Sequence, residues 1–213
     1  MEKNSWAIDR AAEGARSELT GDVTISAPPA LSAAMLIRPL VALRKQHPGR
    51  KICILGETHH ASLDRREADV AIRLSRPVDG DLIIVKLTEL TLRLYGSPAY
   101  LNQTQPEDWT FIGYLESMDA ASQQAALIQQ MAGRSFCIRA STLEIQYALV
   151  REGGGVAMLP DFMAESDSAL VPAAADQQPV IRDVWLVLHP DLKGSAAIRA
   201  VVKSIRESFN TTA

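Results

Sequence analysis

The stretch Ala68-Asp69-Val70-Ala71-Ile72-Arg73-Leu74 is the part of this sequence that says most about its fold. Val70, Ala71, Ile72 and Leu74 form a short apolar run, and a loop with Pro and Gly follows it. A run of this length is typical of a strand that is buried on both faces of a parallel sheet. We therefore predict a strand over residues 69–74 and an α/β fold around it.

Arg73 is the charged residue at the end of this apolar run. Ligands of open parallel sheets bind in the crevice beyond the carboxyl ends of the strands, so a guanidinium at this position would face the ligand. Two other interpretations stay open. The side chain would reach solvent, or it would pair with a carboxylate of its own chain, such as Asp69 or Asp81.

Composition and charge restrict the class of protein. The 213 residues, of which 47% are hydrophobic and 22% charged, are enough for one domain or two small ones. A net charge of −3 without a basic stripe disfavours nucleic-acid binding by these residues. The sequence has no apolar leader and no apolar run long enough to cross a membrane, so we expect a cytoplasmic protein without membrane contact.

Two cysteines, Cys53 and Cys137, each lie within a short apolar run. They are too far apart in the sequence for a metal-binding knuckle. We predict that both are small core residues in a reducing compartment, without a disulfide between them.

Helical and strand patterns alternate through the first part of the chain. A thin apolar stripe over residues 4–20 predicts a helix that ends at Gly21. The next elements alternate with short connections, which predicts a parallel α/β unit. They are strands over 23–27, 51–55 and 69–74, a helix over 30–46 that bends or restarts at Pro39, and a short helix over 61–67.

The pattern changes after residue 82. Only Thr88 and Glu89 separate the apolar runs 82–87 and 90–95, so these runs are either an antiparallel pair or one strand with a kink. A second α/β unit follows, with strands over 109–114, 136–139 and 156–160 and helices over 120–132 and 142–151. A last strand over 184–189 is a candidate crossing back to the first unit, and a closing helix over 196–209 follows it. We expect residues 21–98 with 189–213 to form one subdomain and residues 99–188 the other, with a cleft between them.

The helix over 142–151 begins with a capping-box pattern. Ser141 stands at the predicted cap and Glu144 three residues later. Free N–H groups and the dipole at a helix start favour an anion. Ser141 is therefore interpreted in two ways, as a cap for its own helix or as a ligand contact.

Five stretches occur in an order that resembles the effector-binding domain of LysR-type transcriptional regulators, and the resemblance extends over residues 19–209. The stretches are Gly21 to Leu31, Ala68 to Leu74, Asp79 to Leu82, Leu94 to Leu101 and Gly153 to Pro160. The resemblance implies an α/β fold similar to the type 2 periplasmic binding proteins, with two Rossmann-like subdomains and a small effector in the cleft between them.

The resemblance also implies partners. It implies homodimers or homotetramers, a small-molecule effector, and DNA contact only through a helix-turn-helix domain that is not present in this chain. Residues 1–20 resemble the remnant of the linker helix that joins the two parts in the family.

Eight positions correspond to effector contacts of the family, and they are Pro29, Ala30, Ser32, Thr58, Arg73, Gly113, Ser141 and Thr142. Many family members have Ser or Thr near Pro29 and Ala30, so this sequence lacks a polar anchor there. Thr58 offers a hydroxyl, either to the ligand or to its own turn.

Other chemistry has little support in the sequence. His59-His60 with Asp64 lacks a further ligand at metal-binding spacing, and Ser97 and Ser141 lack a Gly-x-Ser-x-Gly elbow. The Gly153-Gly154-Gly155 run follows a helix and precedes a strand, which is the reverse of a dinucleotide fingerprint, and we interpret it as a helix stop. We expect no metal, no cofactor and no catalysis.

We conclude from the sequence that the chain senses a small polar or anionic organic molecule, and that the effector changes the geometry of a dimer. A free-standing small-molecule binding protein of the same fold is the alternative, which the absence of a signal peptide disfavours. An enzyme on the same fold is a third interpretation, and it would need a polar catalytic set that these residues do not display.

Overall fold

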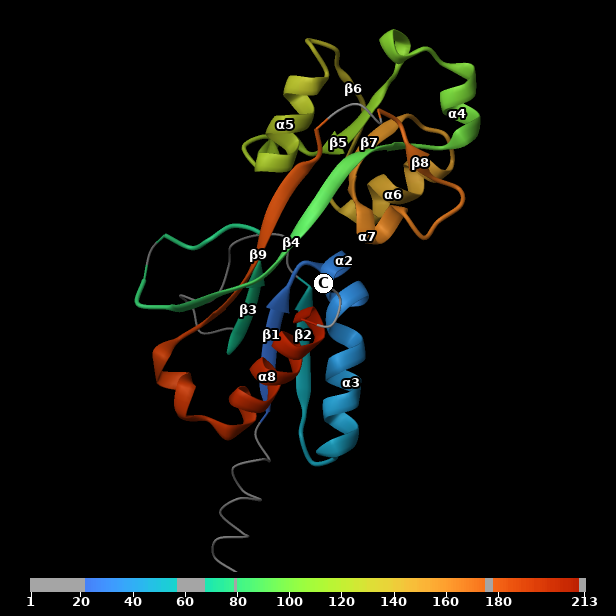
Figure 1. Ribbon diagram of the computed structural model, residues 1–213. Coiled ribbons are helices and arrows are strands. Elements are labelled where there is room, and N and C mark those ends of the chain that lie inside the picture. Colours follow the sequence, from blue (N-terminus) through green and yellow to red (C-terminus); the bar gives the residue numbers. More distant parts are fainter. Residues whose placement is uncertain (1–21, 57–67, 79, 175–177, 211–213) are drawn as a thin grey trace, which may run out of the picture. The chain divides into compact units, whose positions relative to one another are not determined.

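The computed structural model describes residues 22–56, 68–78, 80–174 and 178–210. Contacts divide the chain into two compact units. Unit 1 consists of residues 1–88 and 183–213, and unit 2 of residues 89–182. Strands β4 (Ile83–Gly96) and β9 (Val180–Leu188) each run from one unit into the other (Figure 1). These divisions come earlier in the chain than the boundaries predicted after residues 98 and 188.

Unit 1 contains a sheet with the strand order β2-β1-β3-β9-β4. Strands β1, β2 and β3 are parallel to one another, whereas β9 is antiparallel to β3. Besides its parts of β4 and β9, unit 1 contains β1 (Val23–Ala27), α2 (Pro29–Leu31), the π-helix η1 (Ser32–Leu36), α3 (Ile37–Gln46), β2 (Ile52–Gly56), β3 (Val70–Arg73), the 3₁₀-helix η4 (Pro190–Gly194) and α8 (Ala196–Asn210).

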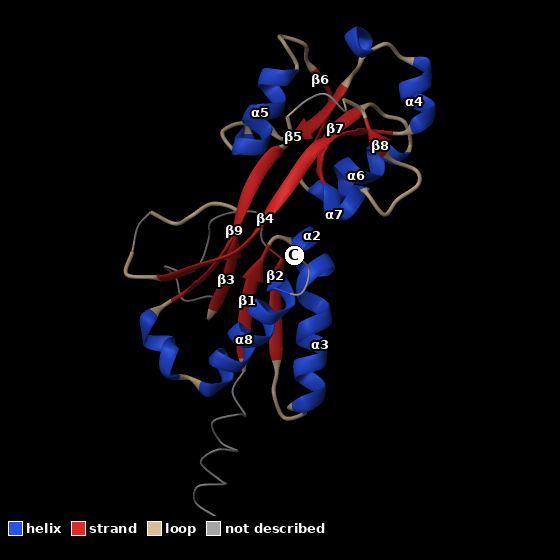
Figure 2. Ribbon diagram, in the orientation of Figure 1, coloured by secondary structure: helices blue, strands red, loops and turns tan. Residues whose placement is uncertain are grey.

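Strand β3 lies in the middle of this sheet, as its apolar run predicted. Val70, Ala71 and Ile72 are fully buried, and β1 and β9 flank the strand on its two sides. Helices α3 and α8 pack against each other, and α8 also packs against β1 (Figure 2). The Ser204 hydroxyl donates a hydrogen bond to the Pro39 carbonyl at 3.2 Å and joins the two helices.

The predicted helix over 30–46 is interrupted, but not at Pro39. The interruption is η1, where the Ile37 N–H bonds to the Ser32 carbonyl five residues earlier. Pro39 lies in the first turn of α3, which follows η1 directly. The π-turn therefore takes the place of the predicted bend.

Unit 2 contains a sheet with the strand order β4-β7-β5-β6, and the short β8 pairs with β4. Strands β5, β6 and β7 are parallel, and β7 is antiparallel to β4. Its further elements are α4 (Pro98–Gln103), η2 (Pro106–Asp108), β5 (Phe111–Tyr114), η3 (Glu116–Met118), α5 (Ser122–Gln130), β6 (Phe136–Ala140), α6 (Leu143–Arg151), β7 (Val156–Pro160), α7 (Asp161–Ala164) and β8 (Val171–Pro172).

The core of unit 2 forms where α6 and α7 meet the sheet. Its buried members include Ile112 of β5, Val150 of α6 and Leu159 of β7, and all three are fully buried. Residues 83–96 form one continuous strand, β4, so the second of the two interpretations of this segment is correct.

Three glycines connect α6 to β7 and confirm the predicted helix stop. Gly153 has a φ of +77°, and its N–H bonds to the Val150 carbonyl, while the Gly154 N–H bonds to the Leu149 carbonyl. This pair of bonds is a Schellman motif, which satisfies the last carbonyls of the helix. Gly155 then brings the chain against β5, because the Val156 N–H bonds to the Thr110 carbonyl at 3.0 Å.

The prediction that both cysteines belong to the core is wrong, since Cys53 and Cys137 are exposed free thiols. Each lies on a strand at the end of the strand order, β2 for Cys53 and β6 for Cys137. An edge strand is covered on one side only, so an apolar run there does not imply burial.

Some predicted elements lie outside the described residues, namely the helices over 4–20 and 61–67. Within the ranges that the structure describes, no helix combines the length and the apolar character that a membrane crossing requires.

Candidate functional site

The carboxyl ends of β1, β2 and β3 meet at one edge of the unit 1 sheet, because these strands are parallel. Pro28 follows β1 and precedes α2, which begins with Pro29 and Ala30. A Cβ atom at Gly56, the last residue of β2, would lie 3.3 Å from Pro29 Cγ. The end of β2 therefore packs directly against the turn that carries two of the predicted contacts.

Ser32 is a buried hydroxyl at this same edge. Its N–H bonds to the Pro28 carbonyl at 2.9 Å, and the residue is 5% exposed. Among the described residues, no group forms a hydrogen bond with its Oγ. A buried hydroxyl without a partner costs free energy, so a ligand or a water molecule that completed its hydrogen bonds would be favoured here.

Arg73 ends β3 next to β1 and is 7% exposed, so it does not reach freely into solvent. Its Nη1 donates to the Ser26 carbonyl at 3.1 Å and to the Ile72 carbonyl at 3.0 Å. Asp69 instead accepts a hydrogen bond from the Thr24 N–H at 2.8 Å, at the opposite end of β1. The guanidinium therefore joins two strands at their carboxyl ends.

Thr58 lies outside the described residues, as do His59, His60 and Asp64. Within the described ranges, no three or more His, Cys, Asp or Glu side chains are grouped so that they could hold a metal ion.

Gly113 lies on β5 at the corresponding edge of unit 2, and it is buried. A Cβ atom at this position would lie 2.3 Å from Phe136 Cε1 and 2.9 Å from Gln124 Nε2. Glycine is therefore required so that the ring from β6 and the amide from α5 can both pack over β5.

A polar network that the sequence analysis missed surrounds this edge. The buried Gln124 accepts from the Tyr114 N–H at 3.1 Å, and its Nε2 donates to Asp119 Oδ1 at 3.1 Å. Arg139 Nη1 donates to the Tyr114 carbonyl and to Asp119 Oδ1, both at 2.9 Å, and the guanidinium lies 4.3 Å from the centre of the Phe136 ring. This network holds the ends of β5 and β6 together.

The hydrogen bond from Arg139, with a second one from Gln124, holds the pKa of Asp119 below its usual value of 3.8. A carboxyl whose pKa is lower in the folded state stabilises the fold above its unfolded pKa, and this contribution is lost as the pH falls through the folded pKa. Asp119→Asn should therefore reduce stability at pH 7 and have little effect in acid.

Urea unfolding of both proteins between about pH 3 and pH 7 would measure this difference. Asp108→Asn, which removes a carboxylate from an exposed position of the same unit, is the matched control for the loss of one negative charge. A constant difference between Asp119→Asn and the native chain at every pH would contradict the assignment.

The predicted cap at Ser141 is wrong by one residue. Thr142 is the N-cap of α6, with an extended backbone, and its Oγ1 accepts from the Ile145 N–H at 3.4 Å. Ile145 therefore holds the position that the capping-box pattern assigned to Glu144. Ser141 is exposed and precedes the cap, so its hydroxyl is not used to begin the helix.

The start of α6 has donors available next to these two residues. Its first intrahelical bond runs from the Gln146 N–H to the Thr142 carbonyl, so the N–H groups of Leu143 and Glu144 precede the hydrogen-bonded turn. Gln146 is 1% exposed, and its Nε2 has no hydrogen-bond partner among the described residues. The sequence analysis missed Gln146, although a polar residue between Leu143 and Val150 on the apolar side of α6 was a usable signal.

The predicted residues thus form two groups, each in its own unit. Pro29, Ala30, Ser32 and Arg73 lie at the carboxyl edge of the unit 1 strands, and Gly113, Ser141 and Thr142 lie at the carboxyl edge of the unit 2 strands. Arg139 ends an apolar run just as Arg73 does, and the same sequence signal could have identified it.

A family model described as the LysR substrate binding domain matches residues 16–210. The chain therefore belongs to the LysR substrate-binding domain family. This is a family of effector-binding domains of regulators, not of enzymes.

Individual relatives agree with this class. The chain is 27% identical over 158 residues to the Mau operon transcriptional activator of Paracoccus denitrificans. The aligned region covers 73% of this chain and 54% of that protein. The chain thus spans about half the length of this curated relative.

Solved structures show the same fold, that of LysR regulatory domains of the type 2 periplasmic-binding-protein class. The regulatory domain of CrgA from Neisseria meningitidis has a TM-score of 0.77 at 19% identity, with 89% of this chain and 99% of that chain covered. The effector domain of AmpR from Pseudomonas aeruginosa has a TM-score of 0.72 at 18% identity, with 90% and 97% covered. Full-length AphB from Vibrio cholerae has a TM-score of 0.72 at 21% identity, with 96% of this chain and 76% of AphB covered.

Proposed function

We propose that this chain is the effector-sensing domain of a LysR-type transcriptional regulator and that it binds a small polar or anionic organic molecule. The observation that carries the proposal is the buried Ser32 hydroxyl, which has no partner among the described residues and lies at the carboxyl ends of parallel strands. In α/β sheets this is the edge at which ligands bind. Family membership supplies the biological context.

The proposed contacts come from both groups of residues. In unit 1 they are Pro29, Ala30, Ser32 and Arg73, and we retain Thr58 as a proposed contact from the sequence. In unit 2 they are Gly113, Ser141 and Thr142, to which we add Gln146 as a donor. Guanidinium N–H groups and helix N-terminal N–H groups both prefer an anion, which supports a carboxylate effector.

An effector acts as a signal only if it binds one arrangement of the regulator better than another. LysR-type regulators read DNA through a helix-turn-helix domain and form oligomers. We propose the same for the protein that uses this chain, so DNA would be contacted by the helix-turn-helix domain, and the site of action would be the cytoplasm. A free-standing binding protein is less favoured, because the family and the relatives named above are regulators.

Removing the Ser32 hydroxyl separates a ligand role from a structural one. Ser32→Ala should leave stability unchanged or slightly higher, since the hydroxyl forms no hydrogen bond within the described residues, but it should weaken effector binding about tenfold. A thermal-shift screen of small organic acids would find the effector, and the change in Tm would then be compared between the two proteins.

Ser204→Ala is the matched control in the same unit, because the Ser204 hydroxyl is bonded to the Pro39 carbonyl. This control should lose about 1 kcal/mol of stability and keep full effector binding. Equal effector affinity in Ser32→Ala and the native chain would remove Ser32 from the site, and the absence of any stabilising acid would count against the whole proposal.

The proposed homodimer or homotetramer has support in exposed apolar side chains. Ile37 and Val41 lie one turn apart on α3 and are 42% and 48% exposed, and Ile128 and Ile138 of unit 2 are 39% and 37% exposed. Exposed apolar side chains favour association with a second copy, and Ile138 lies on β6 at the end of the strand order. Sedimentation equilibrium should show a dimer or a larger oligomer, and a strict monomer at all concentrations would contradict this part of the proposal.

A further inference from the structure

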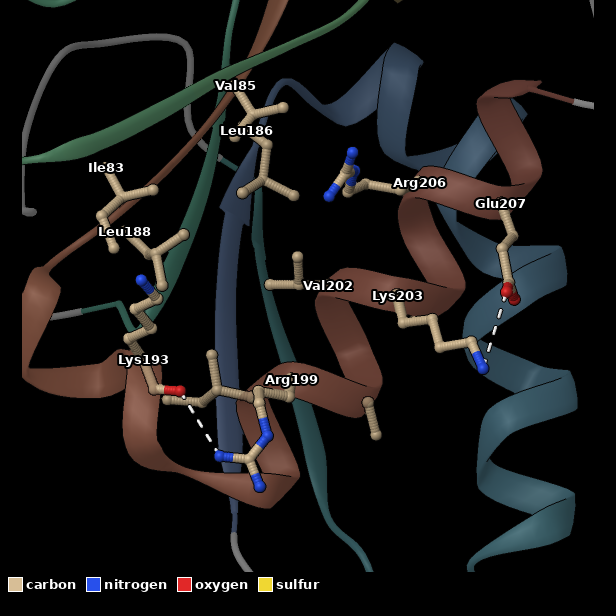
Figure 3. A pocket seen from close by; sticks show the side chains of 12 residues that line it. Ile83, Val85, Leu186, Leu188, Lys193, Arg199, Val202, Lys203, Arg206 and Glu207 are labelled. Carbon is tan, nitrogen blue, oxygen red and sulfur yellow. Dashed lines mark hydrogen bonds and ion pairs between the residues drawn. The ribbon is translucent and has the colours of Figure 1, made fainter.

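An apolar groove of about 710 Å³ lies beside α8 within unit 1, and we refer to it as the α8 groove (Figure 3). Ile83 and Val85 of β4 and Leu186 and Leu188 of β9 form its strand side. The members of each pair are two residues apart, so they lie on the same face of their strand. None of the residues that line the α8 groove belongs to the proposed effector contacts.

The helix side of the α8 groove is cationic. Arg199, Lys203 and Arg206 recur on α8 at a spacing of four and three residues, which places them along one face, and Val202 lies among them. Lys193 of η4 adds a fourth cation, and Glu207 is the acidic residue of the lining. This excess of positive charge contrasts with the net charge of −3 of the whole chain.

Two of the four cations have partners near the rim. The Arg199 guanidinium donates to the carbonyls of Gly194 and Lys193, and the Lys203 Nζ lies 3.8 Å from Glu207 Oε1. Like charges one turn apart repel each other, and the single carboxylate of Glu207 offsets only part of this repulsion.

The other two cations, Lys193 and Arg206, have no hydrogen bond or ion pair from their side chains within the part of the chain that the structure describes. Figure 3 shows Lys193 extending toward Leu188 and Arg206 extending toward Leu186. Each charged group thus lies beside the apolar strand side of the α8 groove. A ligand at either place could put its anionic group next to a cation and its apolar part against the apolar side chains of the strands.

We propose that the α8 groove is a second ligand site, which binds a small carboxylic acid with a hydrocarbon body. Its volume is within the range of roughly 300–1,000 Å³ that is usual for small-molecule pockets. An inorganic anion would use only exposed cations, and exposed ion pairs contribute little. A neutral hydrocarbon would leave the cations unused. Only a ligand that combines both features uses the whole groove.

Octanoate is a suitable probe, and isothermal titration of the full chain is the measurement. 1-Octanol has the same body without the charge, and acetate has the charge without the body. We expect octanoate to bind at one site and both comparison compounds to bind at least about tenfold more weakly.

Substitutions at the rim and on the wall locate the site. Arg206→Gln should weaken octanoate binding about tenfold, and Val202→Glu should abolish it, because a carboxylate at this apolar position of α8 repels the anion. Arg44→Gln removes the same charge from an exposed position on α3 and should change the affinity by less than about twofold. Circular dichroism would verify that each variant is folded.

Several results would overturn the proposal. Octanol binding as tightly as octanoate would mean that the cations do not recognise the ligand. An effect of Arg44→Gln as large as that of Arg206→Gln would indicate general charge attraction. Binding that is lost in a Ser141→Trp variant but retained in Val202→Glu would place octanoate at the proposed effector contacts, and binding of an acidic peptide without binding of octanoate would assign the groove to a protein partner.

Discussion

Gly155→Ala should lower the free energy of unfolding by roughly 3 kcal/mol or more, the largest stability effect that we expect from a single methyl group in this chain. Gly155 has a φ of +139°, where residues with a side chain are strained. A Cβ atom there would also lie 2.6 Å from the Thr110 carbonyl oxygen. That oxygen belongs to the backbone and accepts the Val156 N–H, so it cannot move away without breaking the contact between β5 and β7.

Gly133→Ala separates the two causes of this effect. Gly133 also has a positive φ, +86°, but no atom lies within 4 Å of its added Cβ. Its substitution should therefore cost only the conformational part, about 1–2 kcal/mol. Urea unfolding of both variants would measure the difference. Equal losses would mean that the backbone contact at Thr110 contributes nothing.

Arg73→Ala should have the largest effect on effector binding and should also reduce stability. The substitution removes the donor to the Ser26 and Ile72 carbonyls in a buried position, which we expect to cost about 2–3 kcal/mol. Because Arg73 is one of the proposed effector contacts, the affinity for an anionic effector should fall by more than about tenfold. Titration at a temperature at which the variant is fully folded would measure the affinity.

Arg73→Lys is the informative comparison, because it keeps the charge but loses the planar fork. We expect it to recover part of the effector affinity and little of the stability. An unchanged affinity in Arg73→Ala together with a clear loss of stability would show that Arg73 only joins β1 to β3.

Local sequence patterns predicted the elements of this fold well where one strand or helix determines its own burial. The apolar run at residues 70–72 is such a case, since a strand that is covered on both faces of the sheet is apolar at successive positions. Cys53 and Cys137 lie in similar runs and yet are exposed. Which strand ends the sheet depends on the order of the strands in space, and the sequence does not display that order.

The candidate site was predictable to a smaller extent. Gly113 was found through family resemblance, but the reason for a glycine there is the Phe136 ring, which comes from a different strand. Gln124 and Asp119 reach Arg139 only after α5 and β6 have packed against β5. The shift of the cap from Ser141 to Thr142 depends on the backbone angles at the end of β6, which neighbouring Ser and Thr residues do not distinguish.

The path of the chain has a consequence for the order in which the protein folds. All of unit 2 is one uninterrupted segment, whereas unit 1 needs residues from both sides of it. Strand β9, which pairs with β3, and helix α8, which packs against β1, are completed only after the segment of unit 2 has been made. During synthesis, unit 2 can therefore fold before unit 1 is complete, because unit 1 also needs β9 and α8.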